Sequence, residues 1–151
     1  MSQYVLAIIG AGEGALPIIN AAKEMGIIVV AYGRNDSLAK DQVDVFVEEN
    51  NFDIQFIADS CRELNVNGIM PSSELSTEVA ARVANTAGLL GNDIEHGFGG
   101  KNKYFMRTKV ASLVSVKQPK FQLYEEGIDV AFPVVVKSVD ACGKRGVSIA
   151  Y

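Results

Sequence analysis

Short apolar runs alternate with helical stretches along residues 1–92 of the chain. Tyr4 to Ile9 and Ile27 to Tyr32 are apolar runs rich in β-branched residues, and each is followed by a glycine. Their length is typical of buried parallel strands. Between them, apolar residues recur at helical spacing and stop at Gly26, so this part of the chain predicts a βαβ unit.

The same alternation continues further along the chain. Three more strand-like runs follow, at 43–47, 68–71 and 89–90, with a helical apolar stripe in each interval between them. Asn50 or Asn51 is the expected cap of the first of these helices. Parallel strands need crossovers that carry the chain back across the sheet, so we expect helices on both faces. Residues 1–92 are therefore predicted to form one Rossmann-like α/β domain with a parallel sheet.

The pattern changes at residue 93. Glycines crowd the segment around His96 and predict a loop or linker, in which His96 is a loop residue rather than a catalyst. A helix is expected at 102–113, followed by strand-like pieces at 121–124, 132–136 and 147–151. The last two pieces flank a glycine-containing loop and predict a β-hairpin. Residues 93–151 are thus predicted to form a linker helix and the first hairpin of a second, incomplete domain.

Composition limits the partners of the protein. The 151 residues carry 14 Lys and Arg against 18 Asp and Glu, a net charge of -4, and 48% of them are apolar. This balance gives no reason to expect nucleic acid or an anionic membrane, and no apolar run is long enough to span a bilayer. The N-terminus lacks a secretory signal, and Cys61 and Cys142 stand apart without metal-ligand spacing. We therefore expect a cytoplasmic protein with reduced thiols.

A glycine-rich segment is the first candidate site. Gly10-Ala11-Gly12-Glu13-Gly14-Ala15 follows a predicted strand and opens a helix, which is the setting of a GxGxxA phosphate loop. Small residues allow a ligand close to the backbone, and free N–H groups at a helix start favour an anion. Alternatively, the glycines serve a tight turn without any ligand. Arg34, after the second strand, would suit the 2′-phosphate of NADP, so an NADP-binding module is an alternative function.

Basic residues gather at two further places. Lys103 and Arg107 are four positions apart on the predicted helix and share a face, where they could meet a phosphate. Lys137 ends an apolar strand and precedes the turn Gly143-Lys144-Arg145-Gly146-Val147. A strand-borne cation beside such a turn can hold a nucleotide phosphate while backbone amides cover it. A solvated helix face and an exposed basic hairpin are the alternatives without a function.

Taken in order, these pieces resemble the ATP-grasp superfamily, and most closely the carbamoyl-phosphate synthase large-chain-like proteins. The order is a GxGxxA domain, an Asn-Lys-Tyr-Phe-Met-Arg helix, a Gln-Pro turn, a Pro-Val-Val-Val-Lys strand and a Gly-Lys-Arg-Gly-Val loop. The resemblance implies a pre-ATP-grasp domain followed by the beginning of an ATP-grasp domain. It implies that ATP phosphates are contacted by Lys103, Lys137 and a mobile loop of Gly143, Lys144, Arg145, Gly146 and Val147. A small-molecule carboxylate substrate would bind at Gly10, Gly12, Glu13, Ser73 and Glu74.

The resemblance also implies a reaction. ATP-grasp ligases activate a carboxylate as an acyl phosphate, which an amine then attacks, and magnesium bridges the ATP phosphates. The implied function is therefore that of a carbon–nitrogen ligase with ATP and Mg²⁺ as cofactors. Ser138 departs from the proline that often follows the strand lysine in these proteins.

The family pattern bears on what this chain can do by itself. The adenine-binding hinge and the acidic magnesium ligands of the family lie beyond the glycine loop, so we expect an N-terminal fragment that is inactive by itself. Its last hairpin is expected to be mobile, and the exposed edge of that hairpin could pair two copies in a homodimer. A non-catalytic nucleotide-binding or interaction domain is the remaining alternative.

Overall fold

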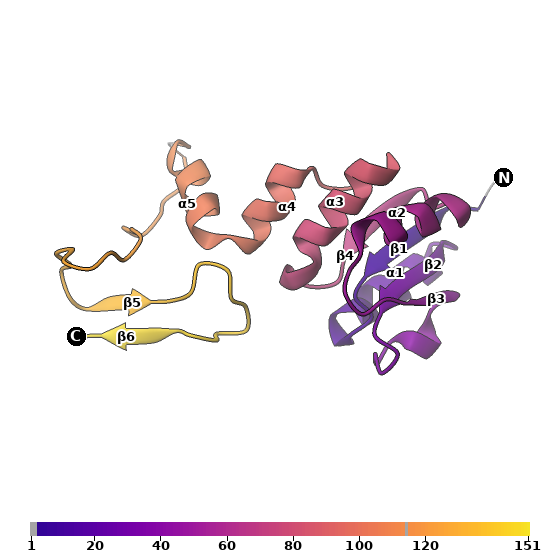
Figure 1. Ribbon diagram of the computed structural model, residues 1–151, viewed down its shortest axis with the longest axis horizontal. Coiled ribbons are helices and arrows are strands. Elements are labelled where there is room, and N and C mark those ends of the chain that lie inside the picture. The colour runs from indigo at the N-terminus through magenta and orange to yellow at the C-terminus, as the bar shows by residue number, and fades with distance from the viewer. Residues whose placement is uncertain (1–2, 114) are drawn as a thin grey trace. The chain divides into compact units, whose positions relative to one another are not determined.

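The chain divides into two compact units, Met1–Phe98 and Gly99–Tyr151. The computed structural model describes residues 3–113 and 115–151. Unit 1 contains a parallel sheet with helices, and unit 2 contains a helix and a hairpin (Figure 1). No helix within the described residues has the length and the apolar character needed to cross a membrane.

Unit 1 is built on a four-stranded parallel sheet. Its strands are β1 (Val5–Ile9), β2 (Ile28–Gly33), β3 (Val45–Glu48) and β4 (Gly68–Pro71), in the spatial order β3-β2-β1-β4. Strand β1 pairs with β2 on one side and with β4 on the other. Apolar residues fill the inner strands because both faces of a parallel sheet are covered. The Rossmann-like α/β sheet predicted from the sequence is confirmed.

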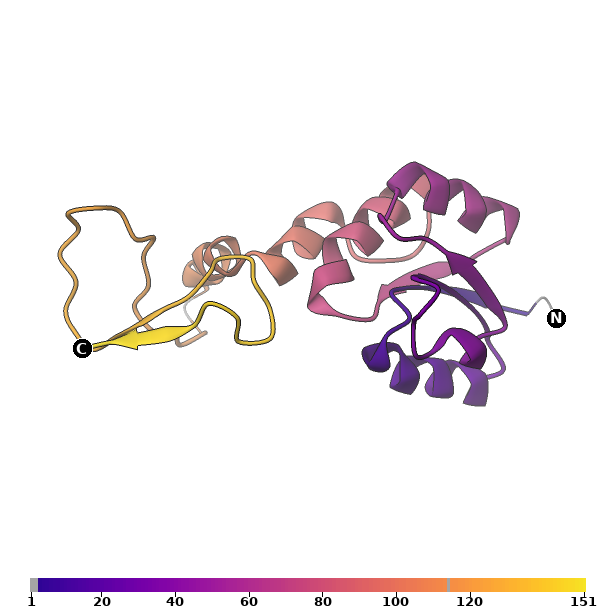
Figure 2. The same cartoon turned by 60° about the horizontal axis from the view of Figure 1, so that its bottom comes forward.

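Helices cover both faces of this sheet. They are α1 (Leu16–Glu24), α2 (Ile54–Glu63) and α3 (Thr77–Ala87). The 3₁₀ turns η1 (Glu13–Ala15) and η3 (Glu74–Ser76) directly precede α1 and α3, and η2 (Lys40–Gln42) lies between β2 and β3. Figure 2 shows α1 on one side of the sheet and α2 on the other. Side chains alternate along a strand, so β1 sends Ile8 into the core beside α1, and Ala7 and Ile9 into the core beside α2 and α3.

A small polar cluster lies within the core beside α2. The Tyr32 hydroxyl donates to Ser60 Oγ at 3.0 Å and lies 3.4 Å from Cys61 Sγ. Burial raises the pKa of the Tyr32 phenol above its ordinary value, and burial likewise raises the pKa of the Cys61 thiol. Both groups therefore stay protonated at neutral pH, and we assign the cluster a structural role.

A helix stands where crowded glycines predict a loop. Helix α4 (Ile94–Lys101) includes Gly97, and a Cβ built on Gly97 would lie 2.4 Å from Ala81 Cβ of α3. A Cβ on Gly91 would likewise lie 2.8 Å from Ala84 Cβ. The prediction of a loop around His96 is wrong for residues 94–101, which form α4, because Gly91 and Gly97 allow close packing against α3 instead of supplying flexibility.

Unit 2 contains helix α5 (Lys103–Ala111) and an antiparallel hairpin of β5 (Val134–Val136) and β6 (Ser148–Ala150). The Asn102 side chain caps α5 by accepting the Phe105 N–H at 2.9 Å. The strand predicted at 121–124 is not formed in this described segment. Its first ring, Phe121, instead packs edge-on against Tyr104 with 5.9 Å between the ring centroids.

Candidate functional site

Two loops meet at the carboxyl edge of the sheet in unit 1. The strand order reverses between β1 and β4, whose following helices α1 and α3 lie on opposite faces. Such a reversal opens the crevice in which open α/β sheets bind ligands. The predicted substrate residues occupy these two loops: Gly10, Gly12 and Glu13 after β1, and Ser73 and Glu74 after β4. The loops are in contact, since the Ser72 N–H donates to the Ile9 carbonyl at 3.0 Å.

The close contact between the two loops explains why glycine is required at two positions of the loop after β1. A Cβ on Gly10 would lie 2.5 Å from Ser72 Oγ, and one on Gly14 would lie 2.6 Å from the Ser72 carbonyl oxygen. Gly10 also has a φ of +90°, which L side chains rarely adopt. By contrast, a Cβ on Gly12 would meet no atom of the described chain within 4 Å. Gly12 is therefore the glycine of this loop whose backbone is open to a ligand.

The loop after β4 is fixed by its own hydrogen bonds. Ser73 and Ser76 form a capping box at the start of η3: the Ser73 N–H donates to Ser76 Oγ at 3.2 Å, and that hydroxyl donates to the Ser73 carbonyl at 3.0 Å. Ser76 is buried, whereas Ser73 and Glu74 are exposed. Glu13 and Glu74 are the first residues of η1 and η3, and both are exposed, so each loop presents a carboxylate to solvent.

Arg34, the candidate for an NADP phosphate, lies directly after β2. Its guanidinium pairs with the Asp36 carboxylate at 2.7 Å, and the two side chains are 69% and 70% exposed. An ion pair this exposed contributes about 0–1 kcal/mol, so it would yield readily to a phosphate.

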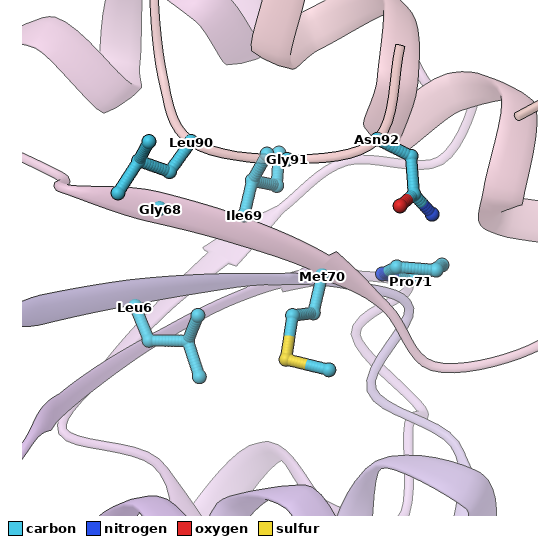
Figure 3. A pocket seen from close by; sticks show the side chains of 8 residues that line it. All are labelled: Leu6, Gly68, Ile69, Met70, Pro71, Leu90, Gly91 and Asn92. Carbon is cyan, nitrogen blue, oxygen red and sulfur yellow. The ribbon is translucent and has the colours of Figure 1, made fainter. Parts of the chain in front are cut away.

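A shallow hollow lies along β4 in unit 1 (Figure 3). Its volume is about 350 Å³, and it is lined by Leu6, Gly68, Ile69, Met70, Pro71, Leu90, Gly91 and Asn92. Leu6 and Met70 project to one side of β4, and Leu90 lies on the other side. The lining is apolar apart from Asn92 and the backbone, and it includes none of the predicted site residues.

In unit 2, helix α5 begins against the segment that leads into the glycine turn. The Lys103 backbone N–H donates to the Val139 carbonyl at 2.9 Å, and the Lys103 ammonium donates to the Ala141 carbonyl. An N–H at the start of a helix has no partner inside that helix, and here Val139 supplies one. Lys103, the first of the two lysines predicted to bind ATP phosphates, is therefore in contact with the segment just before the predicted nucleotide loop.

The glycine turn itself has a left-handed backbone at three positions. The φ angles are +64° at Gly143, +61° at Lys144 and +66° at Gly146. Glycine adopts such values freely, whereas lysine adopts them rarely, so Lys144 has the least favourable backbone conformation of the three positions. Arg145 folds back on the turn: its Nε donates to the Cys142 carbonyl at 3.3 Å, and a terminal guanidinium nitrogen lies 3.3 Å from Cys142 Sγ.

The remaining basic residues differ in their surroundings. Lys137, directly after β5, is exposed, as are Lys144 and Val147 in and after the turn. The guanidinium of Arg107, a residue of α5, lies over the Phe121 ring, 5.9 Å from its centroid. Arg107 therefore helps to pack Phe121 against α5. The contacts of Lys103 with the Val139 and Ala141 carbonyls were not predicted, because a backbone acceptor leaves no signal in the sequence.

Comparison with known proteins identifies solved structures of the same fold. No protein-family model matches the chain, and no curated protein matches it significantly. N5-carboxyaminoimidazole synthetase from Staphylococcus aureus, solved with ADP, matches with a TM-score of 0.81 and 14% identity, over 98% of this chain and 42% of that one. L-amino acid ligase from Bacillus licheniformis matches with a TM-score of 0.78 and 20% identity, over 99% and 39%. Phosphoribosylglycinamide synthetase from Anaerococcus prevotii matches with a TM-score of 0.70 and 22% identity, over 99% and 39%.

These matches concern the fold. The chain spans about two fifths of the length of each solved relative. Within that span, the chain has the fold of the N-terminal portion of these ligases, and the α/β fold predicted from the sequence is confirmed.

Proposed function

We propose that this chain is the N-terminal part of an ATP-dependent carboxylate–amine ligase of the carbamoyl-phosphate synthase-like kind. Unit 2 binds the phosphates of ATP, and the crevice of unit 1 binds a small-molecule carboxylate. The observation that carries the proposal is the contact of the Lys103 backbone and ammonium with Val139 and Ala141. Through this contact, a lysine from α5 and the turn at 143–146 belong to one local arrangement, as a shared phosphate ligand requires.

The cations of unit 2 meet the negative charge of the nucleotide. The Lys137 and Lys144 side chains are exposed, so their ammonium groups are free to approach a phosphate without losing a buried position. The left-handed backbone at Gly143 and Gly146 suits a turn whose amides point toward an anion. Arg145 joins this set once its guanidinium leaves Cys142, whose carbonyl oxygen it meets in a hydrogen bond that is long at 3.3 Å and whose sulfur is a weak acceptor.

The proposed reaction has two steps. The substrate carboxylate attacks the γ-phosphorus of ATP, which gives an acyl phosphate and ADP, and an amine then attacks the acyl carbon and releases phosphate. Magnesium bound with ATP supplies further charge neutralisation. Among the described residues, no group of three or more His, Cys, Asp and Glu side chains is arranged to hold a metal ion. We assign the phosphate charge within this chain to lysine and arginine side chains of unit 2.

The two adjoining loops of unit 1 suit a ligand that approaches the backbone at Gly12. The Gly12 position is open, and the Ser73 hydroxyl lies on the neighbouring loop. Glu13 and Glu74 would repel a carboxylate, so we assign them to the amine-bearing side of the substrates and assign Gly12 and Ser73 to the carboxylate. The apolar side chains exposed on the hairpin of unit 2 would also support a homodimer.

Nuclear magnetic resonance titration of the 151-residue chain with MgATP tests the nucleotide site, since it detects weak binding. We expect saturable amide shift changes at residues 137–147, and their loss in Lys137→Ala. Lys120→Ala is the matched control, because Lys120 is an exposed lysine of the same unit. Wild-type chain without shift changes, or Lys137→Ala with unchanged binding, would overturn the proposal.

An NADP-binding module is the second candidate, favoured by the open backbone at Gly12 and by Arg34 after β2. Titration with NADPH separates the two functions. Shift changes at residues 10–15 that Arg34→Ala abolishes would support the NADP site, and the absence of any response to NADPH would exclude it. A chain that responds to neither nucleotide is the outcome expected of a non-catalytic interaction domain.

A further inference from the structure

Lys103 has two separate links to the segment that precedes the glycine turn. Its backbone N–H donates to the Val139 carbonyl at 2.9 Å, and its ammonium reaches two residues further, to the Ala141 carbonyl. The Lys103 side chain is partly buried, unlike the exposed ammonium of Lys137. The two links fix both the direction of the chain at 139–141 and its distance from the start of α5.

The turn that follows has few other restraints of its own. Cβ atoms built on Gly143 would meet no described atom within 4 Å, and one on Gly146 would meet only Ser138 Cβ, at 3.9 Å. Besides the Lys103 links, the segment shows a Ser138 hydroxyl that donates to Asp140 at 3.0 Å and the Arg145 contacts with Cys142. Both of these are contacts between residues two or three positions apart, so neither ties the segment to another element. Lys103 supplies the tie to α5.

An ammonium group has three N–H donors and no acceptor. One donor on the Ala141 carbonyl leaves two for other acceptors, so a phosphate oxygen could bind Lys103 without breaking the link. A single cation that holds both the backbone and a phosphate couples the two: order in the segment favours phosphate binding, and phosphate favours order in equal measure.

We propose that Lys103 is a positioning residue. Its hydrogen bond to the Ala141 carbonyl holds residues 139–141, which lead into the glycine turn, in place before any nucleotide binds. The claim that Lys103 also couples this order to phosphate rests on the proposed nucleotide site. The positioning role itself needs no nucleotide, so the two can be tested apart.

Backbone ¹⁵N relaxation of residues 139–147 in the full chain, without nucleotide, tests the positioning role. Lys103→Met keeps the length and the apolar stem of the side chain and removes its donors. We expect order parameters at 139–147 to fall below about 0.6, the range of flexible backbone, while those of α5 stay unchanged. Lys103→Arg retains a donor for the Ala141 carbonyl, so it should restore most of the order. Lys120→Met controls for the loss of a lysine charge in the same unit.

The possible outcomes separate the two claims. Unchanged order parameters at 139–147 in Lys103→Met would overturn the positioning role, even if that variant bound MgATP weakly. Loss of order in Lys103→Met, with rescue by Lys103→Arg, supports the positioning role. If the wild-type chain then shows no further ordering with MgATP, the coupling to phosphate is wrong and the positioning role stands. A variant that disorders α5 as well contradicts the local role that we assign to the side chain.

Discussion

The two units of the chain use similar apolar residues and bury them to very different extents. In unit 1, Ile8, Ile57 and Tyr32 are fully buried between sheet and helices. In unit 2, Val135 and Ile149 face each other across the hairpin and are 59% and 58% exposed. No described residue from Gly99 to Tyr151 is fully buried. Unit 1 therefore has a core of its own, and the hairpin of unit 2 has an apolar surface without cover inside its unit.

This difference bears on where function can reside. Segments with few buried contacts open at low free energy, and binding loops are drawn from such segments because they must move. The predicted phosphate residues lie in unit 2, around a turn that has little packing. The predicted substrate residues lie in unit 1, on loops fixed by the contact of Gly10 and Gly14 with Ser72. The comparison thus assigns a rigid site to unit 1 and an adaptable site to unit 2.

Hydrogen exchange should show the largest contrast between the two units. Amides of β1 and β2 exchange through global unfolding, because they lie inside a covered sheet. Amides of β5 and β6 need only local opening. For a domain of ordinary stability, we expect the first group to exchange more than about 10³-fold more slowly. Strong protection at 134–136 and 148–150 in the monomer would break the comparison, because it would show that the hairpin is held as firmly as the sheet.

Replacing one isoleucine in each unit by alanine compares how much buried and exposed side chains contribute to the free energy of unfolding. Ile57→Ala leaves a cavity beside the sheet and should lower the free energy of unfolding by about 2–5 kcal/mol. Ile149→Ala removes an exposed side chain and should change it by less than about 1 kcal/mol. Urea unfolding followed by circular dichroism measures both. Equal losses from the two variants would mean that the hairpin shares the stability of unit 1.

Much of unit 1 could be predicted because local signals and burial agree there. The runs that become β1 and β2 are apolar without alternation, as a sheet covered on both faces requires. Gly26, with a φ of +72°, follows the end of α1 as predicted, and Gly88, with a φ of +70°, ends α3 in the same way. The cap of α2 was misplaced: Asp53, rather than Asn50 or Asn51, accepts the Phe56 N–H at 2.9 Å.

The errors elsewhere have tertiary causes. Glycines at 91 and 97 read as a linker because sequence alone does not distinguish a flexible glycine from one that allows close packing. The strand expected at 121–124 has suitable apolar residues, but Phe121 packs on Tyr104 and Arg107 of α5 instead. The link between Lys103 and Ala141 depends on a backbone carbonyl 38 positions away. Contacts of this kind require the fold before they can be recognised.

Glycine substitutions distinguish packing from ligand access in the loop after β1. Gly14→Ala would bring a methyl group to 2.6 Å from the Ser72 carbonyl, so the two loops must separate. We expect a loss of about 1–3 kcal/mol in the free energy of unfolding. Gly12→Ala, which meets open space, should change stability by less than about 0.5 kcal/mol. Thermal unfolding of both variants provides the measurement, and a Gly12→Ala loss as large as that of Gly14→Ala would remove the argument that Gly12 is open to a ligand.

The helix caps provide the finest comparison, since each unit has one of the same geometry. Asp53 accepts the Phe56 N–H in unit 1, and Asn102 accepts the Phe105 N–H in unit 2, both at 2.9 Å. Replacing either cap by alanine costs its helix about 1 kcal/mol. Because α2 packs on the covered sheet, Asp53→Ala should lower the global unfolding midpoint in urea.

Helix α5 has no buried residue in its described length, so the cost of Asn102→Ala should remain local. We expect faster exchange of the α5 amides with little change in the global midpoint. If Asn102→Ala instead shifted the midpoint as far as Asp53→Ala, the two units would unfold as one, and the absence of burial in unit 2 would no longer explain its behaviour.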